Sequence, residues 1–221
     1  MLPTNKPIFC YVTDRRSLPA SKGESEEDES LLSSIERAAT AGVDWIQIRE
    51  KDLPGGRLAA LTRIAISRAG NARILVNDRL DIALATGTRG IHLGETSLPA
   101  GDALRAVRAA KAKGIAPSDF LVGVSTHSLQ AACAAEKAGA SYTFFGPVFP
   151  TPSKAAYGLP QGLDRLAEVC RAMQIPVLAI GGITAENAPA CLAAGAGGVA
   201  AIRLFQAGWD SAAIRKLREV L

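Results

Sequence analysis

Short apolar stretches rich in β-branched residues alternate along the whole chain with alanine-rich segments whose apolar residues recur at helical spacing. The first pattern is typical of buried parallel strands, and the second of helices that cover a sheet. Eight such strand and helix pairs follow one another. This alternation predicts an α/β protein built from repeated β-α units.

The predicted strands are Ile8–Thr13, Trp45–Ile48, Ile74–Val76, Gly90–Leu93, Leu121–Val124, Tyr142–Phe145, Val177–Ile180 and Gly198–Ala201. The predicted helices are Ser30–Ala41, Gly56–Ala69, Leu80–Ala85, Ala103–Ala112, Leu129–Ala138, Leu163–Met173, Ala185–Ala193 and Ser211–Val220. Several helices end at a glycine, such as Gly42 and Gly139, which suits a left-handed cap. The acidic run Glu24–Glu29 is expected to be a solvated loop before the first helix. Eight units in 221 residues predict one domain over residues 1–221, a single (β/α)8 TIM barrel.

Composition and charge exclude several other classes of protein. No apolar run approaches the roughly 20 residues of a membrane-spanning helix, and residues 1–7 lack the apolar core of a signal peptide. The net charge of +4 is small and the basic residues are dispersed, so neither nucleic acid nor a membrane is an expected partner. Four widely spaced cysteines indicate reduced thiols rather than disulfides or a zinc site. We therefore expect a cytoplasmic protein that acts on small molecules, with its oligomeric state left open.

Polar residues gather just past the predicted strands, where a TIM barrel builds its active site. The loop after the sixth strand, Gly146–Lys154, is the most informative of these segments. Thr151, Ser153 and Lys154 offer two hydroxyl donors and one cation to an anionic group, while three prolines lower the entropy lost when the loop is ordered. This loop is expected to bind phosphate.

The second strand leads into Gln47, Arg49 and Lys51, which are spaced two residues apart. In an extended segment this spacing turns all three side chains the same way, and in a barrel strand that way is inward. Two cations and an amide on one face are costly unless an anion lies between them. We favour an oligophosphate site; an exposed charge cluster is the alternative.

The third and seventh strands end in residues that suit a metal ion and a second phosphate. Asn77 and Asp78 follow the third strand, and a chain with two histidines and no clustered thiols would hold a metal by oxygen, which indicates Mg²⁺. The alternative is that they cap the next helix. Gly181 and Gly182 would let backbone amides approach a phosphate, although tight packing of the turn explains them equally well.

The two histidines are expected to differ in role. His92 lies inside the fourth strand and is interpreted as a satisfied interior histidine. His127 follows Ser125 at the end of the fifth strand and is a candidate for proton transfer. If Ser125 or Ser128 caps the following helix, His127 would stand there for no chemical reason.

Seven segments carry a resemblance that is far more specific than any one motif. In order they are Tyr11–Arg15, Gln47–Asp52, Val76–Arg79, Gly90–Gly94, Gly123–His127, Gly146–Lys154 and Ile180–Thr184. Together they resemble the thiamine phosphate synthase family nearly end to end. The resemblance implies a (β/α)8 barrel that joins hydroxymethylpyrimidine diphosphate to thiazole phosphate, giving thiamine phosphate and pyrophosphate. It also implies that Mg²⁺ assists the departure of pyrophosphate.

The resemblance implies roles for the positions that match the family residue by residue. The pyrophosphate would be held by Arg49, Lys51 and Asn77, with Lys154 neutralising its charge as it leaves. Gln47 would face the pyrimidine, Ser125 would hydrogen-bond its amine, and Asp78 would bind Mg²⁺. The thiazole phosphate would be taken by Thr151, Ser153 and the Gly182 amide. The reaction would pass through a pyrimidine carbocation, which needs positioning and anion stabilisation but no protein nucleophile.

Two positions depart from the family pattern. Where the family has a second magnesium aspartate, this chain has Ser97, and Glu95 two residues earlier could point to the same side if the segment stays extended. We therefore take Glu95 as the second metal-ligand candidate. Arg203 stands where the family has a serine that contacts the thiazole phosphate, and arginine also binds phosphate with a different reach.

These departures leave two alternatives to a synthase. A related thiazole tautomerase keeps the barrel and the thiazole phosphate site without magnesium-pyrophosphate chemistry, and the missing carboxylate favours it. The retained Gln47, Arg49 and Lys51 set favours the synthase. A non-catalytic regulator that binds thiamine phosphate is the third possibility.

Overall fold

The computed structural model of the chain describes residues 6–19, 23–94, 96–151, 159–206, 214 and 217–218. Eight strands pair in parallel in chain order, and the last pairs with the first, so the sheet closes into a barrel. They are β1 (Ile8–Val12), β2 (Trp45–Ile48), β3 (Arg73–Asn77), β4 (Gly90–Leu93), β5 (Leu121–Thr126), β6 (Tyr142–Phe145), β7 (Val177–Ile180) and β8 (Gly198–Ala201). The closed barrel confirms the predicted (β/α)8 fold.

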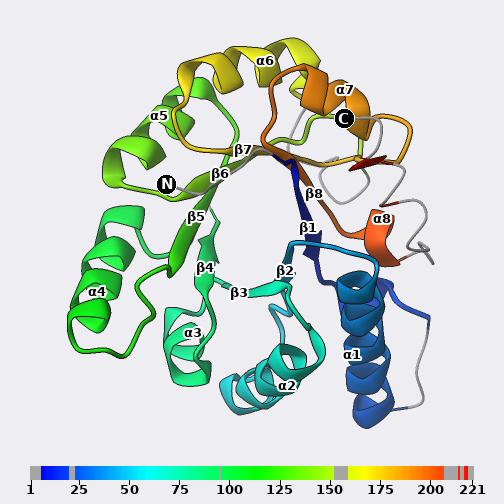
Figure 1. The fold of residues 1–221 in the computed structure, drawn as a ribbon, viewed down its shortest axis with the longest axis vertical. Helices are drawn as coiled ribbons and strands as arrows, with labels where there is room; N and C mark the ends of the chain where they lie inside the picture. The colour runs from blue at the N-terminus through cyan, green and yellow to red at the C-terminus, as the bar shows by residue number, and fades with distance from the viewer. Residues whose placement is uncertain are drawn as a thin grey trace.

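Helices surround the strands, with α1 to α4 around one half of the ring and α5 to α7 around the other (Figure 1). They are α1 (Glu24–Thr40), α2 (Gly55–Arg68), α3 (Leu80–Thr86), α4 (Ala100–Ala112), α5 (Leu129–Ala138), α6 (Gly162–Ala172), α7 (Ala188–Ala193) and α8 (Arg203–Gln206). A 3₁₀ turn, η1 (Arg15–Ser17), follows β1. None of the helices in the described residues is long and apolar enough to cross a membrane.

The hydrophobic core has two layers because side chains of a strand alternate between its faces. On β2, Ile46 and Ile48 belong to the layer between the strands and the helices, whereas Trp45 belongs to the cluster inside the barrel. By the same alternation Gln47, which is buried, points into the barrel. The inner layer is completed by aromatic and aliphatic side chains, among them Tyr142 and Phe144.

The expected solvated loop at Glu24–Glu29 is wrong, because this run forms the first turns of α1. Carboxylates near a helix N-terminus are favoured by the helix dipole. They also meet arginines of the next helix: Asp28 lies 2.8 Å from Arg57, and Glu29 lies 2.6 Å from Arg68. The acidic run is thus a helix start that is tied to α2 by ion pairs.

Other boundaries differ from those predicted by a few residues. Ser125 and Thr126 belong to β5, and Asn77 belongs to β3, rather than to the loops that follow. α7 starts three residues late because Thr184 and Asn187 bond to each other's backbone amides ahead of it. Of the predicted helix Ser211–Val220, only residues 214, 217 and 218 lie among the described residues.

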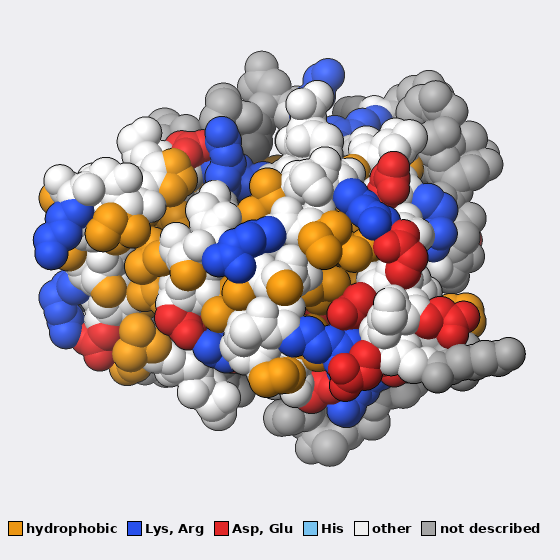
Figure 2. All heavy atoms as spheres, turned by 90° about the horizontal axis from the view of Figure 1, so that it is seen from below, with side chains coloured by type: hydrophobic (Ala, Val, Ile, Leu, Met, Phe, Trp, Pro, Cys, Tyr) orange, Lys and Arg blue, Asp and Glu red, His pale blue; other side chains and the backbone are white. Residues whose placement is uncertain are grey.

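The outer surface carries mixed charge. On the face drawn in Figure 2, lysine and arginine side chains are dispersed among acidic and apolar ones rather than collected in one tract. Cys10 and Cys191 are buried, Cys170 is half-buried and Cys133 is exposed, and all four are free thiols. The described residues of this face therefore form no single basic tract of the kind that binds nucleic acid.

Candidate active site

Most of the candidate side chains lie at the C-terminal ends of the parallel strands, and therefore at one mouth of the barrel. Within or just past their strands come Gln47, Arg49 and Lys51 of β2, Asn77 and Asp78 of β3, Ser125 of β5, Thr151 after β6, Gly182 after β7 and Arg203 after β8. Three candidates, Glu95, Ser153 and Lys154, lie outside the described residues. The mouth therefore gathers chain segments that are far apart in the sequence.

A row of hydrogen bonds joins β2, β3 and the segment after β4. Gln47 Nε2 donates to Asn77 Oδ1 at 2.9 Å, and Asn77 Nδ2 donates to Asp78 Oδ2 at 3.3 Å. The Ser97 hydroxyl donates to the other oxygen of Asp78 and accepts from the Gly94 amide. Asp78 therefore has a donor on each carboxylate oxygen.

The carboxylate of Asp78 sets the direction of this row. An ionised carboxylate only accepts hydrogen bonds, so the Asn77 amide must turn its NH₂ to Asp78 and its oxygen to Gln47. Gln47 then gives its NH₂ to Asn77. Its remaining atom, Oε1, is buried without a hydrogen-bond partner in the described part of the chain. A buried acceptor of this kind is costly unless a ligand supplies a donor.

Asp78 has a strained backbone. Its φ of 64° lies in the left-handed region, which few residues other than glycine adopt. The conformation is held by its amide, which donates to the His92 carbonyl at 2.9 Å. The alternative that Asn77 or Asp78 caps α3 is wrong, since the N-cap is Arg79 and no side chain caps the helix. Both side chains are turned toward the mouth network instead.

The residues present fit a magnesium ion that takes only one or two of its ligands from the protein. Mg²⁺ keeps several waters and takes one or two carboxylates plus phosphate oxygens. Asp78 provides one such carboxylate, and each of its oxygens keeps a lone pair beyond the bonds from Asn77 and Ser97. Within the described residues no group of three or more His, Cys, Asp or Glu side chains forms a metal site. The described residues therefore supply Asp78 alone, and the remaining ligands would come from Glu95, which lies outside them, from water and from a bound phosphate.

A second network lies beside the first, within the barrel. His92 is buried, with Nδ1 at 3.0 Å from the Tyr142 hydroxyl and Nε2 at 2.9 Å from Ser125 Oγ. Burial, and secondly the positive charge of Arg49, lower the pKa of His92 to about 3, so the ring is neutral. Burial also raises the pKa of Tyr142, which keeps its proton. His92 is the satisfied interior histidine that the sequence predicts.

The tautomer of His92 follows from Tyr142. In the described part of the chain the Tyr142 hydroxyl bonds to His92 alone, so its proton is used only if it donates to Nδ1. The hydrogen of the neutral ring is then on Nε2 and is donated to Ser125 Oγ. Ser125 Oγ accepts the hydrogen of His92 Nε2 from inside the barrel, so its own hydroxyl hydrogen remains available to a ligand at the mouth.

The opposite side of the mouth is shaped by the turn after β7. Gly181 and Gly182 have φ of 93° and 68°. A Cβ on Gly182 would lie 2.6 Å from the Pro150 carbonyl oxygen, so a side chain does not fit there. Asn187 steadies the turn by donating to the Gly182 carbonyl at 2.9 Å. Close packing of the loop after β6 against this turn therefore explains the two glycines, which is the alternative that the sequence left open.

Two further contacts complete this side. Arg203 Nη2 donates to Thr151 Oγ1 at 3.1 Å, which joins the loops after β6 and β8. His127 Nδ1 bonds to the Gly146 carbonyl. Ser128, not Ser125, caps α5 by accepting from the Ala131 amide at 3.1 Å. This cap meets the condition under which His127 would stand beside it for no chemical reason, so the structure favours that alternative over proton transfer. Arg203 and Thr151 therefore meet as the expected thiazole-phosphate side would need.

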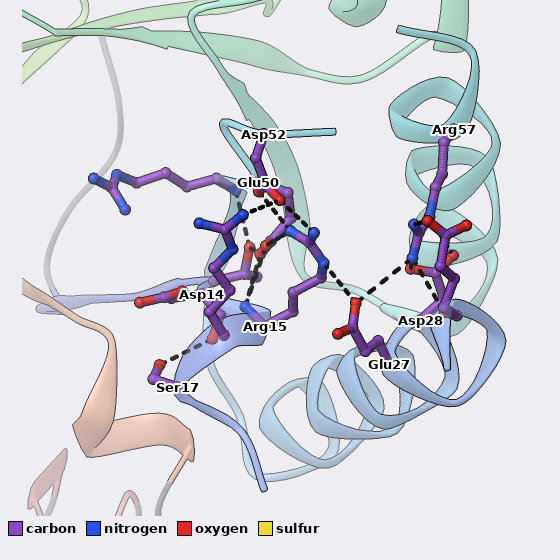
Figure 3. A network of polar contacts seen from close by, with 12 residues as sticks. Asp14, Arg15, Ser17, Glu27, Asp28, Glu50, Asp52 and Arg57 are labelled. Carbon is purple, nitrogen blue, oxygen red and sulfur yellow. Dashed lines mark hydrogen bonds and ion pairs between the residues drawn. The ribbon is translucent and has the colours of Figure 1, made fainter. Parts of the chain in front are cut away.

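Some functional contacts were not expected from the sequence. In the sequence Tyr142 belongs to an apolar strand pattern, and nothing there predicts that its hydroxyl bonds to His92. The bond from Ser97 to Asp78 joins positions 19 residues apart and was not predicted either. An ion-pair cluster around Arg15 and Glu50 was also missed (Figure 3). The signal available for Glu50 was its place between two cations at alternate positions.

A separate cavity of about 760 Å³ lies at the opposite, N-terminal end of the barrel. Its charged lining is internally paired, since Arg73 Nη2 lies 2.9 Å from Asp119 Oδ2. Conserved chemistry in a TIM barrel is built at the other end. We therefore place the active site at the C-terminal mouth and not in this cavity.

Comparison with known proteins gives one consistent family. The family model for thiamine monophosphate synthase matches residues 19–205. A thiamine-phosphate synthase of Roseiflexus castenholzii is 38% identical over 221 residues, covering 99% of this chain and 90% of the relative. One from Methanoculleus marisnigri is 44% identical over 185 residues, covering 82% and 83%. The solved thiamine phosphate pyrophosphorylase of Pyrococcus furiosus superposes with a TM-score of 0.81 at 30% identity, over 98% of this chain and 97% of that one.

The depressed pKa of His92 predicts a specific dependence of stability on pH. Below its ordinary pKa of 6.5, the unfolded chain takes up a proton that the folded chain accepts only near pH 3. As the pH is lowered from 6.5 toward 3, the contribution of His92 to the free energy of unfolding therefore decreases by about 1.4 kcal/mol per pH unit. Urea unfolding at pH 6.5, 5.5 and 4.5 should show a shallower fall for His92→Gln than for the native chain. Parallel curves for the two proteins would contradict the assignment.

Proposed function

The chain belongs to the thiamine monophosphate synthase family, and we propose that its barrel mouth joins hydroxymethylpyrimidine diphosphate to thiazole phosphate, with release of pyrophosphate. The protein is an enzyme, a transferase that makes thiamine phosphate in thiamine biosynthesis. The observation that carries this conclusion is similarity to proteins named thiamine-phosphate synthase over most of the chain. That similarity favours the synthase over a tautomerase or a regulator.

Arg49, Lys51 and Asn77 would bind the pyrophosphate. Alternation along β2 supports an inward direction for Arg49, because Gln47 two residues earlier points into the barrel. The charge of Arg49 also acts on His92 inside the mouth. Two cations and an amide NH₂ then lie where a diphosphate needs charge and hydrogen-bond donors.

Gln47 and Ser125 would bind the pyrimidine. The unpaired Gln47 Oε1 needs a donor, and the amine of the pyrimidine is one. Ser125, which accepts from His92, keeps a second lone pair that can accept from the same amine, as the resemblance implies, and its own hydrogen can be donated to a ring nitrogen. These complementary groups support a pyrimidine placed over β2 and β5.

The thiazole phosphate would lie at the opposite side of the mouth. The turn at Gly182 packs against the loop after β6 there, and Arg203 reaches Thr151 from the end of β8. Arginine in place of the family serine adds a cation at this point. Ser153 would add a hydroxyl. This division leaves the two phosphate groups on different strand ends, with the reacting rings between them.

Asp78 and Glu95 would hold the metal, which we propose to be Mg²⁺. The strained backbone of Asp78 and the donors on its carboxylate support a site held ready for a ligand. When bound, Mg²⁺ supplies positive charge to the leaving pyrophosphate. Ser97 keeps the Asp78 carboxylate in place at the position where the family carries an aspartate.

The chain's own groups would act by positioning and by electrostatics. The bond between the pyrimidine methylene and the diphosphate breaks, and the thiazole nitrogen bonds to the resulting carbocation, so no protein nucleophile is required. Lys154 would offset charge on the departing group. His127, whose place the Ser128 cap already explains, would act only if a proton had to be moved. We propose that the enzyme works in the cytoplasm as one domain over residues 1–221.

Lys154 separates the synthase from a tautomerase. In a magnesium-dependent coupling assay with both phosphorylated substrates, Lys154→Ala should lower kcat by about 10²-fold or more, because its charge matters most as pyrophosphate leaves. A chelator should abolish turnover of the native enzyme, and His127→Ala should be milder than Lys154→Ala. Coupling that survives both Lys154→Ala and chelation would sink the proposal; thiazole isomerisation without metal, lost in His127→Ala, would favour a tautomerase.

The metal site predicts opposite effects for two substitutions. Glu95→Gln should weaken Mg²⁺ binding sharply, since it removes a carboxylate ligand, whereas Ser97→Asp should strengthen it by adding one beside Asp78. Calorimetric titration of Mg²⁺ in the presence of pyrophosphate measures both. Ser67→Asp, on an exposed face of α2, is the matched control for added charge. Indifference to both mouth substitutions would argue that no metal binds between Asp78 and Glu95.

A further inference from the structure

A buried ion-pair cluster lies immediately behind the proposed pyrophosphate site (Figure 3). Arg15 is 9% exposed and is held on three sides by carboxylates. Its Nη1 lies 3.2 Å from Glu50 Oε2, its Nε lies 3.2 Å from Glu27 Oε2, and its Nη1 donates to Asp52 Oδ1 at 2.6 Å. The cluster thus ties together η1 after β1, the segment after β2 and the start of α1.

Glu50 is the most deeply buried carboxylate of the cluster, with 4% exposure. Its oxygens accept from the Arg15 backbone amide at 3.2 and 3.3 Å, from the Arg15 guanidinium, and from the Thr13 hydroxyl at 2.6 Å. Every one of these donors comes from the segment that follows β1. Glu50 is therefore held by the segment after β1, and not by the segment between β2 and α2 on which it lies.

The same hydroxyl connects the cluster to the mouth. Thr13 Oγ1 donates to Glu50 and accepts from the Arg49 backbone amide at 2.9 Å. Neighbouring residues of an extended segment face opposite ways, so holding Glu50 outward turns Arg49 toward the mouth. Lys51 follows Glu50 in the turn that the Leu53 amide closes on the Glu50 carbonyl, so its place also depends on how Glu50 is held. Thr13 is fully buried, and its hydroxyl is committed at both ends. The backbone that carries the two cations is therefore held from behind by the two bonds of the Thr13 hydroxyl and by the bonds from Arg15 to Glu50.

The charge of Glu50 pairs with the buried Arg15 but opposes the binding of an anion at the mouth. A buried carboxylate between two cations that bind an anion repels that anion and reduces the local positive charge. Burying it also carries a desolvation cost that only its donors offset. Glu50 opposes the charge of the ligand and yet accepts several hydrogen bonds. Its role is therefore explained by geometry, since those bonds fix the path of the backbone after β2.

We propose that Glu50, with Arg15 and Thr13 as its supports, is a positioning residue that aims Arg49 and Lys51 at the pyrophosphate group of the substrate. The inference rests on the proposed function, which places pyrophosphate at these two cations. Glu50 touches no substrate and acts through the direction of its neighbours. The orientation of the cations Arg49 and Lys51 thus depends on the Glu50 carboxylate, which lies on the other side of the segment from Arg49.

The test uses the sign of the change in affinity for inorganic pyrophosphate. Removing a negative charge beside an anion site would strengthen binding if charge were all that mattered. Glu50→Gln should instead weaken pyrophosphate binding about tenfold or more, because Arg49 and Lys51 are then no longer held in the orientation that binds pyrophosphate. The KM for the pyrimidine diphosphate should rise with it, while the KM for thiazole phosphate stays unchanged. Calorimetry with magnesium pyrophosphate on the full chain measures the first effect, and steady-state kinetics the second.

A second variant removes the link without changing charge. Thr13→Val has nearly the same shape and deletes the hydroxyl that joins Glu50 to the Arg49 amide, so it should weaken pyrophosphate in the same direction. Thr62→Val is its control, since Thr62 is equally buried and bonds the Leu58 carbonyl within α2 at 2.7 Å. Glu50→Asp, which keeps the charge and shortens the reach, should recover part of the binding if its bonds to Arg15 reform.

The outcomes separate the inference from the function it rests on. If Arg49→Ala weakens pyrophosphate binding but Glu50→Gln and Thr13→Val leave it unchanged or tighter, the positioning role is overturned and the proposed site stands. If Arg49→Ala leaves pyrophosphate binding unchanged, the proposed site fails and the inference fails with it. Weakening in Glu50→Gln and Thr13→Val, with Thr62→Val like the native chain, supports the inference.

Discussion

The two-residue period of β2 is the constraint on which the mouth depends. Within the strand it sends Trp45 and Gln47 into the barrel and Ile46 and Ile48 toward the helices. Directly beyond the strand the same alternation sets Arg49 and Glu50 on opposite sides, before the chain turns at Lys51 and Asp52. A slip of one residue in the pairing with β1 would exchange these sides and place Glu50 at the mouth. The register of β1 and β2, with Val12 opposite Gln47, is therefore a functional feature.

A second constraint is that buried polar groups need partners. The Asp78 carboxylate orients Asn77, Asn77 orients Gln47, and the row leaves one acceptor at the mouth. On the β4 to β6 side, Tyr142 sets the hydrogen of His92 and thereby frees the hydroxyl of Ser125. In the first row the half-buried Asp78 decides what Gln47 offers, and in the second the buried Tyr142 decides what Ser125 offers. The hydrogen-bond pattern of the substrate is thus set from within the barrel.

The sequence was sufficient for the barrel because local patterns determine it. The strands Trp45–Ile48 and Tyr142–Phe145 were predicted to the residue, since apolar runs bounded by turns mark them clearly. The start of α1 was missed, because six acidic or polar residues carry no apolar period and their arginine partners lie on α2. The clusters at Asp78 and Glu50 join segments 19 and 35 residues apart, and no local pattern contains such contacts. The sequence predicts which residues lie past the strand ends, whereas the bonds that orient those in the described part of the chain come only from the fold.

The most direct test of this account is an experimental structure of the enzyme with magnesium, pyrophosphate and thiamine phosphate bound. The account predicts that pyrophosphate lies against Arg49 and Asn77, at the ends of β2 and β3. The phosphate of thiamine phosphate should lie against the Gly182 amide at the end of β7, and the pyrimidine amine should donate to Gln47 Oε1. Pyrophosphate bound away from Arg49, or Gln47 Oε1 still unpaired beneath the pyrimidine, would contradict it.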